Sequence, residues 1–119
     1  MRKVDFTCKK ITLKDLVQCN YNLNESEYHI FAEIIKSKKG LSVKELVDKV
    51  KKDRTTVQKI LTKLLNRKLL MKRQINLDRG FMFVYFSKNK EEIVSEIEEN
   101  VEQYFKNINE SIKKWKKDN

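Results

Sequence analysis

The sequence has no proline, only two glycines and two cysteines, and a single histidine. Cys8 and Cys19 are too few for a disulfide scaffold, and we expect both to behave as small buried apolar residues. Because His29 stands alone and no Cys-x-x-Cys or His-x-x-x-His spacing occurs, we expect no metal centre and no cofactor. The sequence also offers no glycine-rich phosphate loop and no nucleophile–base pair, so we expect no enzymatic activity.

Long apolar stretches are also missing, since no run approaches the roughly 20 residues that span a membrane. The opening residues, 1–5, carry positive charge without a following apolar stretch, so we do not expect a secretory signal. At 119 residues, with 37% charged and 39% apolar residues, the chain is predicted to be one domain, or one domain with a short basic arm over residues 1–10. We expect a cytoplasmic protein without a membrane partner.

The charge is concentrated in one part of the chain. The formal net charge is +10, yet residues 49–79 hold eleven Lys or Arg and two acids, whereas residues 88–119 hold seven Lys and eight acids. A lysine-rich surface that serves only solubility would spread its charge evenly. Concentrated positive charge favours a polyanionic partner, with nucleic acid ahead of a membrane surface.

Residues 53–67 have the pattern of a helix with two unlike faces. Asp53 is a suitable N-cap, because its carboxylate can accept the free amide hydrogens of the first turn. One face carries the apolar residues expected to be buried, namely Val57, Ile60, Leu61, Leu64 and Leu65. The opposite face carries hydrogen-bonding and cationic side chains and no carboxylate. Such a face suits contact with phosphates and base edges, which predicts a DNA-recognition helix.

Two helices are predicted upstream of this segment. The first begins at Thr12 as N-cap and extends over about 11–18. The second begins with a capping box formed by Asn24 and Glu27, and its lysine-rich end is followed by Gly40, which can take the left-handed C′ conformation.

A short helix is expected directly before the recognition helix. Ser42 and Glu45 form another capping-box pattern, and Val43–Val50 has helical apolar spacing. Lys51 and Lys52 then make a turn without the usual glycine. Helix, short turn and recognition helix together predict a helix-turn-helix unit.

After the recognition helix the pattern changes to period two. Residues 69–75 combine apolar and basic side chains, and residues 81–86 are dense in β-formers. Between them, 76–80 has turn chemistry, with Gly80 free to take positive φ. This predicts a β-hairpin over 69–86, placed where a wing would stand. Its aromatic residues could stack on single-stranded bases, but we favour packing of alternate ones against the helices.

A long helix is predicted from Asn89 to about Lys117. Apolar residues recur there at spacings of three and four, which gives the helix more apolar surface than a single small core needs. This favours pairing with a second copy over folding back on the same domain. The residues predicted at that interface are Leu13, Leu16, Ile97, Val101, Tyr104, Phe105, Ile108, Ile112 and Trp115. The chain accordingly divides into a DNA-binding domain over 1–87 and a dimerisation helix over 88–119.

This order of elements resembles the winged-helix transcriptional regulators of the MarR and TrmB superfamily, especially small archaeal ones. The matching stretches are Leu23–Tyr28, Leu41–Leu46, Asp53–Val57, Leu69–Arg73 and Asp78-Arg79. The resemblance implies a mainly α, α+β fold: a winged helix-turn-helix domain with a two-stranded β-hairpin wing and a long C-terminal dimerisation helix. It also implies that Arg79 enters the minor groove. No stretch of this sequence resembles the C-terminal sugar-binding part of longer TrmB proteins, so the resemblance does not imply sugar sensing.

The hypothesis is a homodimeric transcriptional regulator that binds double-stranded DNA sequence-specifically. The residues predicted to contact DNA are Ser42, Lys44, Arg54, Thr55, Thr56, Gln58, Lys59, Thr62, Lys63, Arg67, Lys72, Arg73 and Arg79. The candidates near base edges are Thr55, Thr56, Gln58, Lys59 and Thr62, of which Gln58 could bind adenine and Lys59 guanine. The residues expected to hold phosphates are Arg54, Lys63 and Arg67 on the helix, and Ser42, Lys44 and Lys72 at its flanks. The alternative is a winged helix used for protein interaction or for non-specific, chromatin-type DNA binding. Control by an unidentified small-molecule effector, or by Cys8 and Cys19, stays open.

Overall fold

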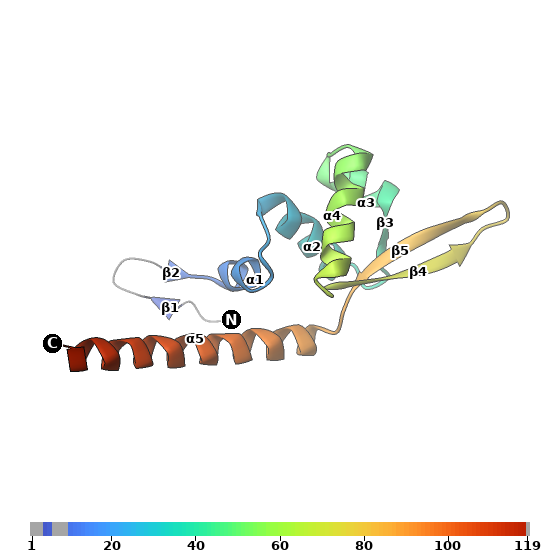
Figure 1. Ribbon diagram of the computed structural model, residues 1–119. Coiled ribbons are helices and arrows are strands. Elements are labelled where there is room, and N and C mark those ends of the chain that lie inside the picture. Colours follow the sequence, from blue (N-terminus) through green and yellow to red (C-terminus); the bar gives the residue numbers. More distant parts are fainter. Residues whose placement is uncertain (1–3, 6–9, 119) are drawn as a thin grey trace.

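The computed structural model describes residues 4–5 and 10–118 (Figure 1). The elements in chain order are β1 Val4–Asp5, β2 Lys10–Ile11, α1 Leu13–Tyr21, α2 Glu25–Lys36, β3 Leu41–Ser42, α3 Val43–Val50, α4 Arg54–Asn66, β4 Leu70–Asn76, β5 Phe81–Ser87 and α5 Lys90–Asp118. This is a winged-helix arrangement with a long C-terminal helix, as the sequence predicts. Cys8 and most of the expected basic arm lie outside the described residues, and Cys19 is exposed rather than buried.

The hydrophobic core lies between α2, α3 and α4. Its fully buried side chains include Ile30, Ile34, Leu46, Leu61 and Leu64, which come from all three helices at helical spacing. The first turns of α5 also contribute to this core, through Ile93 and Ile97. The buried apolar surface fixes α4 by one face and leaves its other face to solvent.

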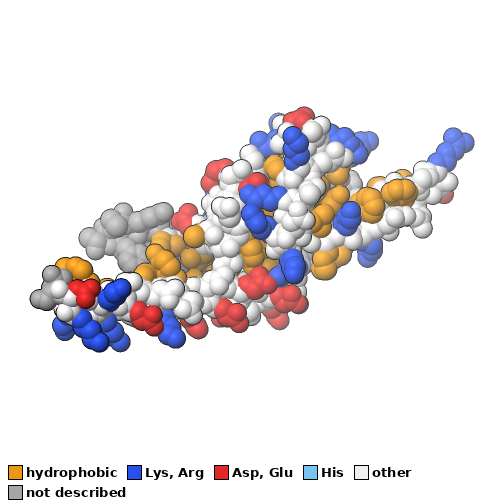
Figure 2. Space-filling view, viewed as in Figure 1, with side chains coloured by type: hydrophobic (Ala, Val, Ile, Leu, Met, Phe, Trp, Pro, Cys, Tyr) orange, Lys and Arg blue, Asp and Glu red, His pale blue; other side chains and the backbone are white. Residues whose placement is uncertain are grey.

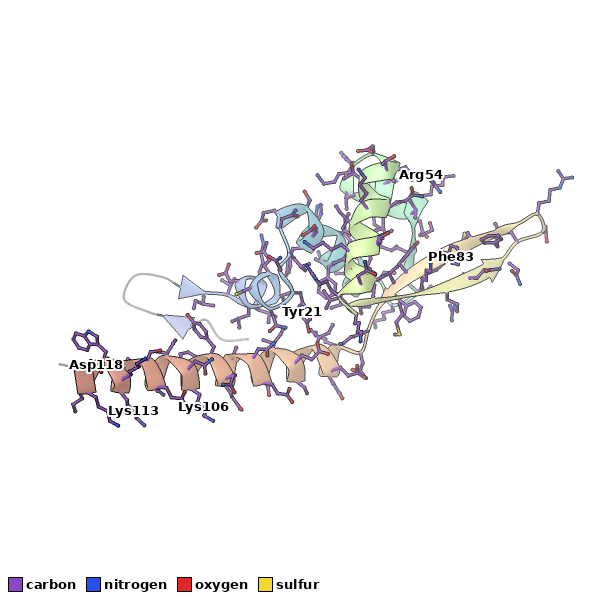
Figure 3. The ribbon with its side chains drawn as sticks, viewed as in Figure 1. Tyr21, Arg54, Phe83, Lys106, Lys113 and Asp118 are labelled. Carbon is purple, nitrogen blue, oxygen red and sulfur yellow. The ribbon has the colours of Figure 1, made fainter. Side chains whose placement is uncertain are left out.

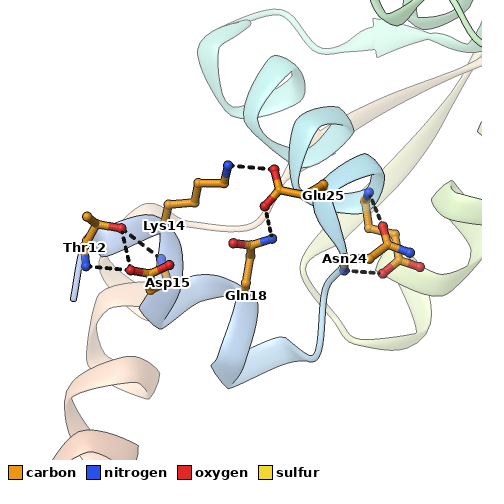
Figure 4. A network of polar contacts seen from close by, with 7 residues as sticks. Thr12, Lys14, Asp15, Gln18, Asn24 and Glu25 are labelled. Carbon is orange, nitrogen blue, oxygen red and sulfur yellow. Dashed lines mark hydrogen bonds and ion pairs between the residues drawn. The ribbon is translucent and has the colours of Figure 1, made fainter. Parts of the chain in front are cut away.

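Side-chain caps define where the helices begin. Complete capping boxes are present at Asn24 and Ser42, as their sequence patterns predict, and at Thr12, which the sequence predicts only as an N-cap. The Glu25 carboxylate joins α1 to α2, because it accepts hydrogen bonds from Lys14 Nζ at 2.7 Å and Gln18 Nε2 at 3.1 Å (Figure 4). Local sequence therefore sets the helix starts, and polar contacts align α1 with α2.

The sheet has three strands rather than the two of the predicted hairpin. Its order is β3-β5-β4, with β3 and β4 both antiparallel to β5. Gly40 has φ +81°, but it does not cap α2, which ends at Lys36 with Ser37 in extended conformation. Gly40 instead lies against β5, where a Cβ would be 2.6 Å from Val84 Cγ1. Its role is thus to let β3 approach the sheet.

The molecule is elongated, with extents of 71 × 24 × 24 Å. Figure 1 shows the β4–β5 hairpin projecting on one side of the helical body and α5 extending on the other. Within the described ranges, none of the helices is long and apolar enough to cross a membrane.

Candidate DNA interface

The outward face of α4 is polar, cationic and free of carboxylates. Val57, Ile60, Leu61 and Leu64 are buried on the inner side. The exposed residues of the helix are Arg54, Thr55, Gln58, Lys59, Thr62 and Asn66, and Arg67 follows as an exposed C-cap. Figure 2 shows Lys and Arg side chains over this part of the molecule, while Asp and Glu gather along α5. Arg54, labelled in Figure 3, points outward at the beginning of the helix.

Asp53 is the acid next to this face, and it is used as the N-cap. Its carboxylate accepts hydrogen bonds from the Thr56 amide at 3.1 Å and from Thr56 Oγ1 at 2.5 Å. These hydrogen bonds from Thr56 lower the pKa of Asp53. The half-buried Thr56 is therefore engaged in the cap, which places it at the margin of the predicted base-contacting set.

The centre of the face has side chains available for recognition. Within the part of the chain that the structure describes, Thr55, Gln58 and Lys59 form no side-chain hydrogen bond or ion pair. Thr62 Oγ1 donates to the Gln58 carbonyl at 3.0 Å, so its hydroxyl retains acceptor capacity only. An amide that both donates and accepts, next to an ammonium group, matches the donor and acceptor pattern of base edges in the major groove.

Lys63 has an internal role that differs from the predicted phosphate contact. Its ammonium group lies 2.7 Å from Glu27 Oε1 and donates to the Asn22 carbonyl at 2.9 Å. The Lys63 side chain is 30% exposed and that of Glu27 is 10% exposed. Burial alone would raise the pKa of Glu27, but the hydrogen bonds from Lys63 and from the Asn24 amide lower it overall. Lys63 thus attaches α4 to the beginning of α2.

Ser42 is likewise occupied within the fold. It is 8% exposed, and its hydroxyl donates to the Glu45 carboxylate while accepting from the Glu45 amide. A hydroxyl used in this way is a helix cap, and contact of Ser42 with a phosphate stays a prediction from the sequence. Lys44, two residues later on α3, is exposed and keeps its predicted position at the flank of α4.

The wing places three cations around its two strands. Lys72 and Arg73 are exposed neighbours on β4 and point to opposite faces of the hairpin, because side chains alternate along a strand. Lys72 Nζ lies 4.6 Å from the centre of the Phe83 ring. Arg79 is exposed in the turn that Gly80 closes with φ +83°. Figure 2 shows basic side chains at the end of this hairpin.

Aromatic packing on the wing differs between its inner and outer halves. Near the body, Val84 is 5% exposed and Tyr85 packs partly against the core. At the outer end, Phe81 is 57% exposed and its ring forms an edge contact with Phe83 at 5.5 Å between centroids. Packing of alternate aromatic residues on the helices therefore holds only for the inner half. Sequence patterning could not detect this, because both halves are equally rich in β-formers.

The predicted interface residues on α1 and α5 are divided by burial. Ile97, which the sequence predicts at an interface, is 4% exposed and belongs with Ile93 to the protein's own core. Leu16, Val101 and Ile108 are partly buried, and those that are largely exposed are Leu13, Tyr104, Phe105, Ile112 and Trp115. The exposed members thus lie along the outer part of α5 and at the beginning of α1.

Polar contacts fix the direction in which α5 leaves the wing. Glu96 accepts a hydrogen bond from Tyr21 Oη at 2.5 Å and pairs with Lys88, the residue that follows β5. Burial and the bond to Glu96 raise the pKa of Tyr21, while Lys88 and then Tyr21 lower that of Glu96. Tyr21, labelled in Figure 3, is the last residue of α1 and lies beside α5. These contacts couple the base of the wing to the long helix.

A family model described as "Sugar-specific transcriptional regulator TrmB" matches residues 17–91, more than half of the chain. The chain belongs to the TrmB family. As a member of a winged-helix family of transcriptional regulators, this TrmB protein is expected to bind DNA, and its family and fold are those of regulators rather than enzymes. The match includes both helices of the helix-turn-helix unit and the whole wing.

Similar proteins agree with this assignment. The uncharacterized protein MJ1082 of Methanocaldococcus jannaschii is 33% identical over 107 residues, covering 90% of this chain and 85% of the relative. A structure described as a possible transcriptional regulator from Methanosarcina mazei Go1 has a TM-score of 0.79 at 25% identity, covering 96% of this TrmB chain and 97% of the other. The structure of Staphylococcus aureus MepR in complex with DNA has a TM-score of 0.54 at 16% identity, covering 85% and 87%, which shows a shared fold.

Proposed function

We propose that the chain is a homodimeric transcriptional regulator that binds double-stranded DNA sequence-specifically. In this proposal α4 lies in the major groove and the wing reaches the adjacent minor groove. The observation that carries the proposal is the exposed face of α4, where Thr55, Gln58 and Lys59 have no side-chain partner among residues 4–5 and 10–118 and no carboxylate lies between them. A helix with this face would be repelled neither by phosphates nor by the acceptor-rich edges of bases.

Each group on this surface has a role that follows from its chemistry. Gln58 would bind adenine through both ends of its amide, and Lys59 would donate to guanine O6 and N7. Arg54 and Arg67, exposed at opposite ends of α4, would hold phosphates on both sides of the groove. Arg79 would enter the minor groove from the turn of the wing. Ser42 and Lys63 are not part of the proposed contact set, because their polar atoms are used internally.

Dimerisation through α5 rests on its exposed apolar side chains. Tyr104 is 63% exposed and Ile112 is 58% exposed, and both lie on the outer part of a helix whose inner turns belong to the core. Large exposed apolar surface of this kind marks an interaction site. A second copy would cover it and would place two recognition helices about one turn of DNA apart.

The test is a fluorescence-anisotropy titration against a panel of duplexes at several salt concentrations, after light scattering has fixed the mass. We expect a dimer that prefers some duplexes strongly. Lys59→Ala should weaken binding to the preferred duplex more than to the others, since it removes a base contact. Lys106→Ala, which removes one exposed lysine from α5, is the matched control and should leave preference and affinity unchanged.

Other outcomes would assign another role. Weak binding that ignores sequence and disappears with moderate salt would favour a chromatin-type function. No binding to any duplex would favour a protein-interaction module. In either case the base-contacting roles of Gln58 and Lys59 would be wrong.

A further inference from the structure

The end of the wing exposes large apolar side chains beside its cationic turn. Leu77 is 49% exposed, Phe81 is 57% exposed and Met82 is 37% exposed, and Arg79 is exposed between them in the chain. Single exposed apolar residues are ordinary, but here three lie within six residues at the end of a projecting hairpin, with Phe81 and Met82 on opposite faces of β5. The projecting end of the wing is therefore apolar as well as basic.

Packing holds this apolar end in a defined shape. The Leu77 amide donates to the Gly80 carbonyl at 3.0 Å, which closes the turn, and Phe81 pairs with Asn76 at the last position of the ladder. The edge contact between the Phe81 and Phe83 rings limits the freedom of Phe81. A pre-ordered apolar group loses little conformational entropy when it enters a binding site.

Charges on both sides of the hairpin indicate what the apolar end contacts. Lys72 and Arg73 lie on opposite faces of the hairpin, and Arg79 is at the turn. Asp78 is the one acidic residue in the sequence of 70–87. A flat surface could meet only one of these faces at a time. A groove with a phosphate ridge on each side would meet both, and the minor groove of duplex DNA is such a groove.

The length of the wing fits that location. Each strand has seven residues, which at about 3.3 Å per residue extends about 23 Å. Half a helical turn of DNA, from a major groove to the adjacent minor groove, is about 17 Å. β4 begins four residues after α4 ends. When α4 lies in a major groove, the end of the hairpin can therefore reach the adjacent minor groove.

We propose that Leu77 and Phe81 act as an apolar wedge in the minor groove that bends the bound DNA, while Lys72 and Arg73 hold the phosphates on either side. Apolar side chains that enter a base step from the minor groove partly unstack it and kink the duplex by about 20–90° toward the major groove. Flexible pyrimidine–purine steps should therefore be preferred under the wing, at positions that no recognition-helix side chain contacts. This inference rests on the proposed function, because α4 must first place the wing.

The experiment measures bending separately from binding. The probe is the duplex bound most tightly in the anisotropy panel, extended to about 30 base pairs, with donor and acceptor dyes at its ends. A second version carries 2-aminopurine at a pyrimidine–purine step under the wing. With saturating parent protein we expect higher energy transfer than in the free duplex and increased 2-aminopurine fluorescence. The double variant Leu77→Ser, Phe81→Ser should lose both signals at saturation.

Controls separate the wedge from a general loss of apolar surface. Met71→Ser removes a side chain that is 47% exposed at the base of the same hairpin, and it should keep the bend. Circular dichroism and light scattering establish that the variants fold and keep their mass. A parent protein that binds its duplex but leaves it straight overturns the wedge while leaving the proposed function intact. A change of mass in the double variant would assign the apolar end to a protein interface and also overturn it. Absence of binding by the parent overturns both proposals.

Discussion

Replacing Lys63 with alanine should destabilise the fold while leaving the salt dependence of DNA binding unchanged. The Lys63 ammonium group donates to the Glu27 carboxylate at 2.7 Å and to the Asn22 carbonyl at 2.9 Å. A hydrogen bond to a charged group contributes about 1.5–3 kcal/mol, and removing one partner of a fully buried ion pair costs about 3–5 kcal/mol. Because the Lys63 side chain is 30% exposed, we expect the unfolding free energy to fall by about 2 kcal/mol, within the range for a hydrogen bond to a charged group rather than that for a fully buried ion pair.

Urea unfolding followed by circular dichroism measures this loss. With a slope of about 1–3 kcal/mol per molar urea, the midpoint should fall by about 1 M. Parent and variant must be compared at one protein concentration, because a dimer gains stability with concentration. Lys59→Ala is the control, and its stability should stay within about 0.5 kcal/mol of the parent.

A different result would show that Lys63 contacts DNA. If Lys63→Ala unfolds like the parent and lowers the slope of log affinity against log salt by about one unit, Lys63 contacts a phosphate. The internal role argued from its contacts would then be wrong, and the original sequence-based assignment would be right.

Three further outcomes are expected. The pKa of Glu27 in the folded protein lies below its ordinary value of 4.5, so its ionised form stabilises the fold above that pH. This contribution disappears as the pH falls through the folded pKa. The unfolding free energy of Glu27→Gln should therefore fall less steeply with acid than that of the parent. Gly40→Ala should cost about 3 kcal/mol in urea unfolding, since its Cβ would meet Val84 at 2.6 Å, whereas Gly80→Ala, in open space at φ +83°, should cost about 1 kcal/mol. Ile112→Glu should halve the mass found by light scattering, because it places a charge in the proposed dimer contact.

Each of these has a clear contrary outcome. An unchanged acid-stability profile in Glu27→Gln would mean that its carboxylate is paired no differently in the unfolded chain. Equal costs at the two glycines would contradict the close approach of β3 to β5. An unaltered mass in Ile112→Glu would remove the outer part of α5 from the dimer interface.

Local signals in the sequence were sufficient for most helix boundaries. Thr12, Asn24, Ser42 and Asp53 are N-caps in the structure, as the sequence predicts, because capping depends on residues no more than three positions apart. The buried stripe of α4 also follows from spacing alone. Even the missing glycine after α3 is explained, since Lys51 itself takes φ +54° in the turn.

Features that depend on distant residues could not be predicted in the same way. The pairing of Lys63 with Glu27 joins positions 36 apart, so an outward cation and an internal one are alike in the sequence. Strand β3 has two residues, which is too short for an alternating pattern, and it forms only because β5 lies beside it. Ile97 shares the heptad spacing of the exposed residues, and only the position of α5 on the core distinguishes them.

The most direct test of the proposed recognition is chemical footprinting on the preferred duplex. Dimethyl sulfate, which methylates guanine N7 in the major groove, is combined with hydroxyl radicals, which cleave the backbone along the minor groove. We expect two protected major-groove tracts about one helical turn apart, each with minor-groove protection beside it that Arg79→Ala removes. Protection of the backbone without any protected guanine N7 on a guanine-containing site, or a single unpaired tract, would contradict recognition by α4 in a dimer.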